Sequence, residues 1–149
     1  MHRNWKFDHV SVVVRDMEKA MKFYESLGIG PFPPLLGPQG KVPLANKTLH
    51  GNPAEWELDL RHAEGGIGNL KFELIQPLEG DTPVRDFLEK NGEGVQHIGF
   101  FVDDIEQETA KLAEKGFEIT QSAETPTVKW AYFGTDAVGG VSIELMQKK

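Results

Sequence analysis

The chain has no cysteine among its 149 residues. Disulfide bonds, thiolate metal sites and cysteine nucleophiles are therefore excluded. It also lacks an apolar run of about 18 residues, the length that a membrane helix needs, and its N-terminus carries no signal-like segment. We therefore expect a cytoplasmic protein that neither spans a membrane nor follows the secretory route.

Basic residues are also few, because 16 Lys and Arg stand against 23 Asp and Glu, for a formal net charge of −7. No basic patch interleaved with aromatic residues occurs, so we expect no binding to nucleic acid. Hydrophobic residues make up 39% and charged residues 26%, as in ordinary globular proteins. The length fits a single domain with a substantial core.

The chain does contain a short pattern that occurs twice. His9 lies in an apolar strand that leads to a helix start at Asp16, and His97 lies in another that leads to Asp104. The two histidines are 88 positions apart, and so are the two helix starts. Later in each half an apolar strand carries a glutamate, Glu73 or Glu144. The repetition predicts one metal ion held between two similar halves.

Hydrophobic spacing predicts the order strand, helix and three strands, twice. The expected strands of the first half are 7–14, 42–49, 56–60 and 70–75, and those of the second are 95–102, 117–121, 128–134 and 140–146. Residues 1–149 form one domain, with a first βαβββ module at 5–78, a linker helix within 79–94 and a second βαβββ module at 95–149. The predicted fold is α+β, with the two modules pairing into a curved mixed sheet around a metal-containing cavity and the helices outside.

Alternation along the strands places the candidate ligands on matching faces. Successive residues of a strand point to opposite sides, and His9, Glu73 and Glu144 each fall on the less apolar side. We expect this mixed face to line the cavity and the aliphatic face to pack under the helices. In the strand near 56–60, the same rule assigns Glu57 and Asp59 to the cavity.

Two imidazoles and two carboxylates are donors that suit Co, Mn, Ni, Zn or Fe. The carboxylates would neutralise a divalent ion, and four protein ligands leave two adjacent positions on a six-coordinate metal. Such an ion can polarise a carbonyl and stabilise an enolate oxygen. His2, His50 and His62 have no matched partner, so we predict that they lie outside the metal site.

Several motifs resemble one known superfamily over nearly the whole chain. The opening Asp8-His9-Val10, followed by DMEKA at 16–20, is similar to that of the vicinal oxygen chelate superfamily, which includes glyoxalase I, bleomycin-resistance proteins, extradiol dioxygenases and methylmalonyl-CoA epimerase. The segments KFELIQP at 71–77 and PVRDFLEKNGEGVQHI at 83–98 are most similar to the epimerase branch. The ligand positions of the family match His9, Glu73, His97 and Glu144.

The resemblance implies a divalent-metal-dependent epimerase or isomerase that acts on a methylmalonyl-CoA-like acyl-CoA and forms a homodimer. By the same resemblance, Glu144 is a base as well as a ligand. The second acid/base is expected on the strand antiparallel to 70–75. If that hairpin centres near Gly65, Glu57 lies directly across from Glu73. Glu55 is the alternative to Glu57.

Other activities remain open. A glyoxalase-like lyase could act on another α-carbonyl substrate with the same ligands. An Fe(II) dioxygenase is disfavoured, because that class uses two histidines and one glutamate and Glu73 would fill a position needed for oxygen or substrate. A non-catalytic small-molecule-binding protein of the bleomycin-resistance type is disfavoured by the complete ligand set.

Overall fold

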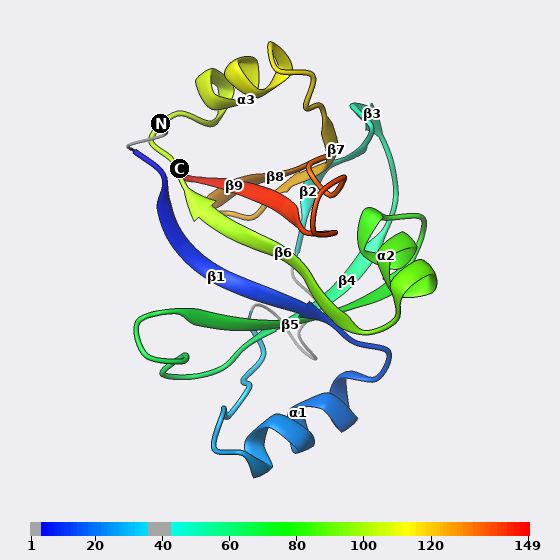
Figure 1. Ribbon diagram of the computed structural model, residues 1–149, viewed down its shortest axis with the longest axis vertical. Helices are drawn as coiled ribbons and strands as arrows, with labels where there is room; N and C mark the ends of the chain where they lie inside the picture. The colour runs from blue at the N-terminus through cyan, green and yellow to red at the C-terminus, as the bar shows by residue number, and fades with distance from the viewer. Residues whose placement is uncertain (1–3, 36–42) are drawn as a thin grey trace.

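The computed structural model describes residues 4–35 and 43–149. Nine strands and three helices are formed by these residues (Figure 1): β1 Lys6–Val13, α1 Met17–Ser26, β2 Ala45–Leu49, β3 Asn52–Pro53, β4 Glu57–His62, β5 Lys71–Glu79, α2 Pro83–Asn91, β6 Gly94–Phe101, α3 Ile105–Ala113, β7 Ile119–Glu124, β8 Val128–Phe133 and β9 Ser142–Lys148. Among these helices, none is both long and apolar enough to cross a bilayer.

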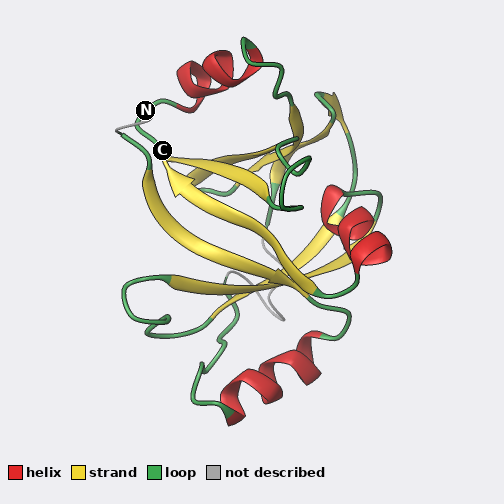
Figure 2. Ribbon diagram, in the orientation of Figure 1, coloured by secondary structure: helices red, strands yellow, loops and turns green. Residues whose placement is uncertain are grey.

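All nine strands belong to one curled sheet, in the order β3-β2-β7-β8-β9-β6-β1-β5-β4 (Figure 2). The first strands of the two halves, β1 and β6, pair antiparallel inside the sheet. Each of them is parallel to the last strand of its own half, β5 or β9. The predicted α+β fold with a curved mixed sheet is therefore confirmed.

One strand of the first half leaves its own module. β2 pairs with β7 of the second half, with Thr48 opposite Ser122, and β3 then leads within a few residues to β4 at the opposite edge of the sheet. The Trp56 Nε1 atom donates to the carbonyl of Thr48 at 3.3 Å, and its ring centroid lies 5.7 Å from that of Trp130. The curl thus brings the two edges of the sheet together. The repeat pattern did not predict that β2 pairs with a strand of the second half.

The helices begin where the sequence predicts. The Asp16 side chain accepts a hydrogen bond from the backbone N–H of Lys19, and Asp104 accepts one from Gln107 in the same way. A side-chain acceptor at the N-cap satisfies an otherwise unpaired N–H of the first turn. The second half therefore repeats the local helix start of the first.

Three apolar clusters form the core. One lies between α1 and the outer face of the first half, and a second lies between α3 and the outer face of the other. The third fills part of the concave side and draws on both halves and on α2: Val13, Trp56, Leu58, Leu60, Ile75, Val84, Leu88, Ala123, Trp130, Tyr132 and Met146. The concave side is therefore shared by both modules and contacted by the helix between them.

The rule that the mixed face lines the cavity is wrong for β4. Leu58 and Leu60 belong to the concave cluster, whereas Asp59 and Arg61 line a cavity beside the start of α1. The Nε atom of Arg61 lies 2.9 Å from Asp59 Oδ1, so the two charges compensate each other under the helix. A paired charge can be covered by a helix at lower cost than an isolated one, and alternation alone does not distinguish the two faces.

Candidate metal centre

The predicted ligands lie in two adjacent cross-strand rows on the concave face. The first row runs across six strands: Lys71, His9, Gly99, Glu144, Tyr132 and Gln121. The second runs across five: His62, Glu73, Ser11, His97 and Ser142. Residues directly opposite each other on paired strands share one face. The register of the sheet therefore brings both histidines and both glutamates to one place.

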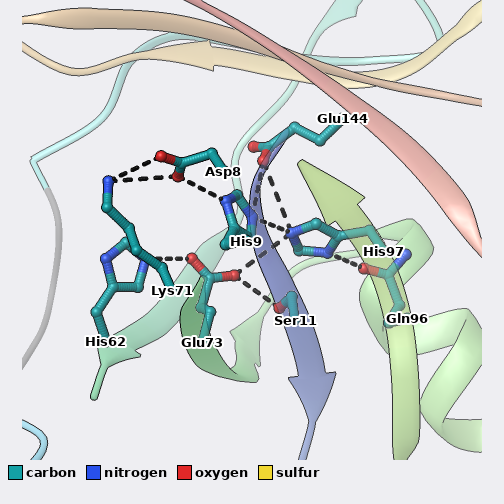
Figure 3. Close-up of polar contacts among 9 residues, drawn as sticks. All are labelled: Asp8, His9, Ser11, His62, Lys71, Glu73, Gln96, His97 and Glu144. Atoms are coloured by element: carbon teal, nitrogen blue, oxygen red, sulfur yellow. Dashed lines mark hydrogen bonds and ion pairs between the residues drawn. The ribbon is translucent and has the colours of Figure 1, made fainter. Parts of the chain in front are cut away.

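The ligand atoms of His9, Glu73 and His97 all lie within 4.8 Å of one another, and Glu144 approaches the two histidines from the other side (Figure 3). His9 Nε2 lies 3.1 Å from His97 Nε2 and 3.1 Å from Glu144 Oε2, and His97 Nε2 lies 3.4 Å from Glu73 Oε1. Adjacent donors around an octahedral ion with bonds of roughly 2.1 Å lie about 3.0 Å apart. These spacings therefore fit donors to a single ion.

Neighbouring side chains fix which nitrogen of each ring faces the centre. His97 Nδ1 donates to Gln96 Oε1 at 2.6 Å, and His9 Nδ1 donates to Asp8 Oδ2 at 3.1 Å. This leaves the two Nε2 lone pairs facing each other, an arrangement that is repulsive unless a proton or a cation lies between them. Such outer hydrogen bonds are typical of metal-ligating histidines, so the donor set fits a divalent ion.

The charges of the cluster also favour a cation among these side chains. Burial would lower the pKa of His9, but the carboxylates of Glu73, Asp8 and Glu144 outweigh it and raise that pKa to about 11. Burial would raise the pKa of Glu73, and the neighbouring His9, His62 and His97 hold it well below its usual range. The carboxylates therefore favour a positive charge at this place, which a proton on His9 supplies when no metal is bound.

Gly99 makes the space that His9 occupies. It lies opposite His9 on one side and opposite Glu144 on the other. A Cβ atom at this position would lie 2.6 Å from His9 Nδ1 and 2.7 Å from its Nε2, well inside van der Waals contact. Only glycine therefore admits the ring of His9 between the two strands.

The two glutamates are held differently. Ser11 Oγ donates to Glu73 Oε1 at 2.6 Å, and His62 Nε2 donates to Glu73 Oε2 at 2.8 Å. Glu144 Oε2 is buried and makes no hydrogen bond with any residue of the described ranges, although it lies at ion-pair distance from His9. Glu73 is therefore held by two hydrogen bonds, whereas Glu144 Oε2 faces the two histidines alone among the described residues.

The expected position of Glu57 across from Glu73 is wrong. Glu57 lies opposite Glu79, and the residue opposite Glu73 is His62. The alternative, Glu55, has a side chain that is 91% exposed and pairs with Lys47. The sheet register thus takes both glutamates away from the position that the sequence assigned to the second acid/base.

The turn of the β4–β5 hairpin explains this displacement. The sequence predicts the turn near Gly65, but Ile67 and Leu70 exchange both backbone hydrogen bonds, which places a two-residue turn at Gly68 and Asn69. Gly68 has φ +64°, the conformation that such a hairpin requires of its first residue. Because two glycine-containing segments compete for the turn, the register moves by several residues.

Four supporting residues were not predicted, and one of them is Asp8, which accepts a hydrogen bond from His9 Nδ1. His62 was placed outside the metal site and contacts Glu73 instead. Gln96 follows the opposite strand face, yet its buried side chain reaches His97. Ser11 shares the face of His9, so alternation could have identified it, whereas the contacts of His62 and Gln96 depend on register and rotamer.

Comparisons with known proteins agree with this geometry. The family model described as Glyoxalase/Bleomycin resistance protein/Dioxygenase superfamily matches residues 8–132. The chain is 32% identical to the mitochondrial methylmalonyl-CoA epimerase of Homo sapiens over 152 residues, which cover 95% of this chain and 73% of the human protein. It is 27% identical to the uncharacterized protein YqjC of Bacillus subtilis, covering 97% of this chain and 93% of that protein.

A solved structure shares the fold. Streptomyces coelicolor methylmalonyl-CoA epimerase in complex with 2-nitronate-propionyl-CoA superposes with a TM-score of 0.64 at 22% identity, covering 97% of each chain. Relatives of this chain in animals and in the bacterium Cereibacter sphaeroides are named epimerases. These names support the conclusion that the chain is an enzyme. With a family model that matches residues 8–132, the chain belongs to the Glyoxalase/Bleomycin resistance protein/Dioxygenase superfamily.

Proposed function

We propose that the protein is a divalent-metal-dependent epimerase that acts on a methylmalonyl-CoA-like acyl-CoA. The observation that carries the proposal is the grouping of His9, Glu73 and His97, whose ligand atoms lie within 4.8 Å of one another. Glu144 Oε2 lies beside this group, 3.1 and 3.7 Å from the Nε2 atoms of His9 and His97. The epimerase relatives support the reaction class. Co, Mn, Ni, Zn and Fe all suit these donors.

Glu144 is the group that we assign to removal of the α-proton. Its Oε2 faces His9 at 3.1 Å and makes no hydrogen bond among the described residues, whereas both oxygens of Glu73 already accept hydrogen bonds. A bound divalent ion would supply stabilisation of the enolate oxygen. The Nδ1 contacts to Asp8 and Gln96 keep the two rings oriented throughout.

The second acid/base has two candidates. Glu57 is the residue that the sequence favours, and it stays a prediction. His62 is favoured by geometry, because it lies across from Glu73 and its side chain is 23% exposed while the four ligands are nearly covered. We therefore place His62 first, on the side of the cluster away from Glu144.

The substrate would approach from the end of the sheet near Asp8. A cavity of about 390 Å³ lies there, lined in part by Lys6, Phe101 and Lys148. The amines of Lys148 and Lys71 lie 5.4 and 5.9 Å from the ring centroid of Phe101. Cations beside an aromatic ring suit an anionic, aromatic carrier such as CoA, and replacing Lys148 with alanine should raise KM more than it lowers kcat.

Proton–deuterium exchange at the α-carbon of methylmalonyl-CoA in D₂O tests the activity. The metal-loaded protein should exchange this proton, and Glu144→Gln should slow the exchange by on the order of a thousandfold. Absence of exchange with full metal loading would exclude the epimerase; turnover of a glutathione hemithioacetal would then support the glyoxalase-like lyase. A homodimer and a cytoplasmic location, expected from the resemblance and the composition, stay predictions.

A further inference from the structure

The two halves share one frame on the outer face of the sheet. Equivalent residues are 88 positions apart, and the pairing of β1 with β6 keeps this relation. Lys6 lies opposite Phe101. Their counterparts, Gly94 and Val13, also lie opposite each other. Each contact beside α3 in the second half therefore has an equivalent place beside α1 in the first.

In the second half, the side chain of Trp5 fills the groove between α3 and β6. Its ring centroid lies 5.4 Å from that of Phe100, and its Nε1 atom donates to Glu108 Oε2 at 2.8 Å. Lys111 donates to the other oxygen of Glu108 at 2.6 Å. Trp5 also packs against the apolar cluster under α3. An indole ring with a paired N–H thus closes this groove.

In the first half, the equivalent groove between α1 and β1 is open. The counterparts of Trp5, Phe100 and Glu108 are smaller residues that line a cavity of about 540 Å³: Glu93, Val12 and Ala20. A cavity of this volume lies within the range of small-molecule sites. The exchange of three large side chains for smaller ones therefore leaves the place of the indole ring unfilled.

The walls of this cavity are mostly apolar. Val14 is buried at its base, the ring of Tyr24 lines it, and Phe23 lines it while remaining 58% exposed. An exposed aromatic side chain beside a cavity marks surface that a ligand can cover. The lining therefore suits a flat ring.

Glu93 supplies an acceptor at the edge of the same cavity. Its Oε1 atom accepts a hydrogen bond from the backbone N–H of Arg15 at 2.8 Å, and its Oε2 atom makes none with the residues that the structure describes. Burial and the charge of Glu93 raise the pKa of Tyr24, which agrees with a carboxylate close to that ring. The cavity thus offers aromatic walls and one carboxylate oxygen but no matching donor.

We propose that this groove binds a free heteroaromatic molecule of the size of indole, whose ring takes the place that Trp5 has in the other half and whose N–H donates to Glu93. The inference does not rest on the proposed function. Val12 and Val14 belong to the cluster under α1, and strand alternation turns them away from the face that carries His9 and Ser11.

The first test is an NMR titration of the full chain with indole, compared with 1-methylindole, which has the same ring system but no N–H. Indole should shift the amide signals of Val12, Ala20 and Tyr24. It should bind about tenfold more tightly than 1-methylindole, because only indole donates to the carboxylate. Glu93→Gln keeps an oxygen for the Arg15 N–H and replaces Oε2 with an amide donor, so it should remove this preference.

Two further variants separate shape from charge. Glu89→Gln removes an equal charge from α2, outside the lining of the cavity, and should leave the preference for indole unchanged. Ala20→Leu adds volume inside the groove and should weaken the binding of both molecules by about tenfold or more. Calorimetric titration measures these affinities, and the fold of each variant is checked by its NMR spectrum.

Three results would overturn the proposal. The first is the absence of indole-dependent shifts at Val12, Ala20 and Tyr24. The second is a preference for indole that survives in Glu93→Gln. The third is a shift of the same amide signals when the ligand-free protein is concentrated, with no binding of indole, because a second copy of the chain would then cover the groove.

Discussion

Glu73 and Glu144 come from equivalent strands of the two halves, yet their surroundings differ. Glu73 accepts hydrogen bonds on both oxygens, from Ser11 and His62. Glu144 Oε2 makes no hydrogen bond among the described residues and faces His9 and His97 at 3.1 and 3.7 Å. Equivalent positions of the two halves thus carry two carboxylates with different surroundings. One is suited to hold a metal firmly, and the other can also take up a proton.

The difference begins at one pair of positions, Ser11 and Gly99, which are 88 residues apart like the two histidines. Ser11 supplies the hydroxyl that fixes Glu73. Its counterpart Gly99 has no side chain and instead makes room for the ring of His9. In the proposed metal centre, equivalent positions of the two halves would supply the ligands. A serine in one half and a glycine in the other would then give the two glutamates different roles.

The largest effect is expected from exchanging the two carboxylates for amides in turn. Glu144→Gln should slow α-proton exchange by on the order of a thousandfold, the usual range for loss of a general base. Glu73→Gln should weaken metal binding and slow exchange by only about tenfold at saturating metal. Exchange rates are measured at saturating metal. If Glu73→Gln were slower than Glu144→Gln, the assignment of Glu144 as the base and Glu73 as a ligand alone would be contradicted.

Gly99→Ala tests the space for His9. The added Cβ would push against the imidazole, and such overpacking costs about 1–3 kcal/mol. The free energy of unfolding should fall by this amount, and metal affinity should fall with it because His9 is displaced. Gly94→Ala, at the start of the same strand with no atom within 4 Å of the new Cβ, is the control and should change neither.

Removing the hydroxyl of Ser11 should have a moderate effect. Loss of a partner that orients a metal ligand costs roughly 10- to 100-fold in metal affinity, so Ser11→Ala should weaken binding by about tenfold. Ser142→Ala, another buried serine in the row of His97, is the comparison. Calorimetric titration with Co²⁺ measures the metal affinity of both variants. Equal affinities of Ser11→Ala and Ser142→Ala would show that Ser11 does not support the metal site.

The smallest effect is expected at Glu57. Glu57 lies opposite Glu79 rather than Glu73. Glu57→Gln should therefore change the exchange rate by less than about twofold, because substitutions away from a functional site usually have small effects. His62→Gln should slow exchange by about tenfold or more. The reverse order of these two variants would restore Glu57 as the second acid/base.

The sequence predicted the features that occur twice. The strands of His9 and His97, the caps Asp16 and Asp104 and the strand faces of Glu73 and Glu144 depend on local alternation and spacing, and each is found in the structure. Matched positions in both halves made the interpretation stronger than any single histidine would allow.

Features that occur once could not be read in this way. The register of β4 depends on which of two glycine segments forms the turn. With the turn that forms, His62 rather than Glu57 lies opposite Glu73. The pairing of β2 with β7 is a contact between distant parts of the chain. The predicted strand at 42–49 begins at Ala45 where it is described, while residue 42 lies outside the described ranges.

Metal binding by single-histidine variants tests the central claim most directly, since His9 and His97 belong to different halves. Calorimetric titration of the metal-free protein with Co²⁺ should give one ion per chain, and His9→Ala and His97→Ala should each abolish binding, whereas His50→Ala should not. Undiminished binding in either of the first two variants, or two independent ions per chain, would contradict a single metal centre shared by the two halves.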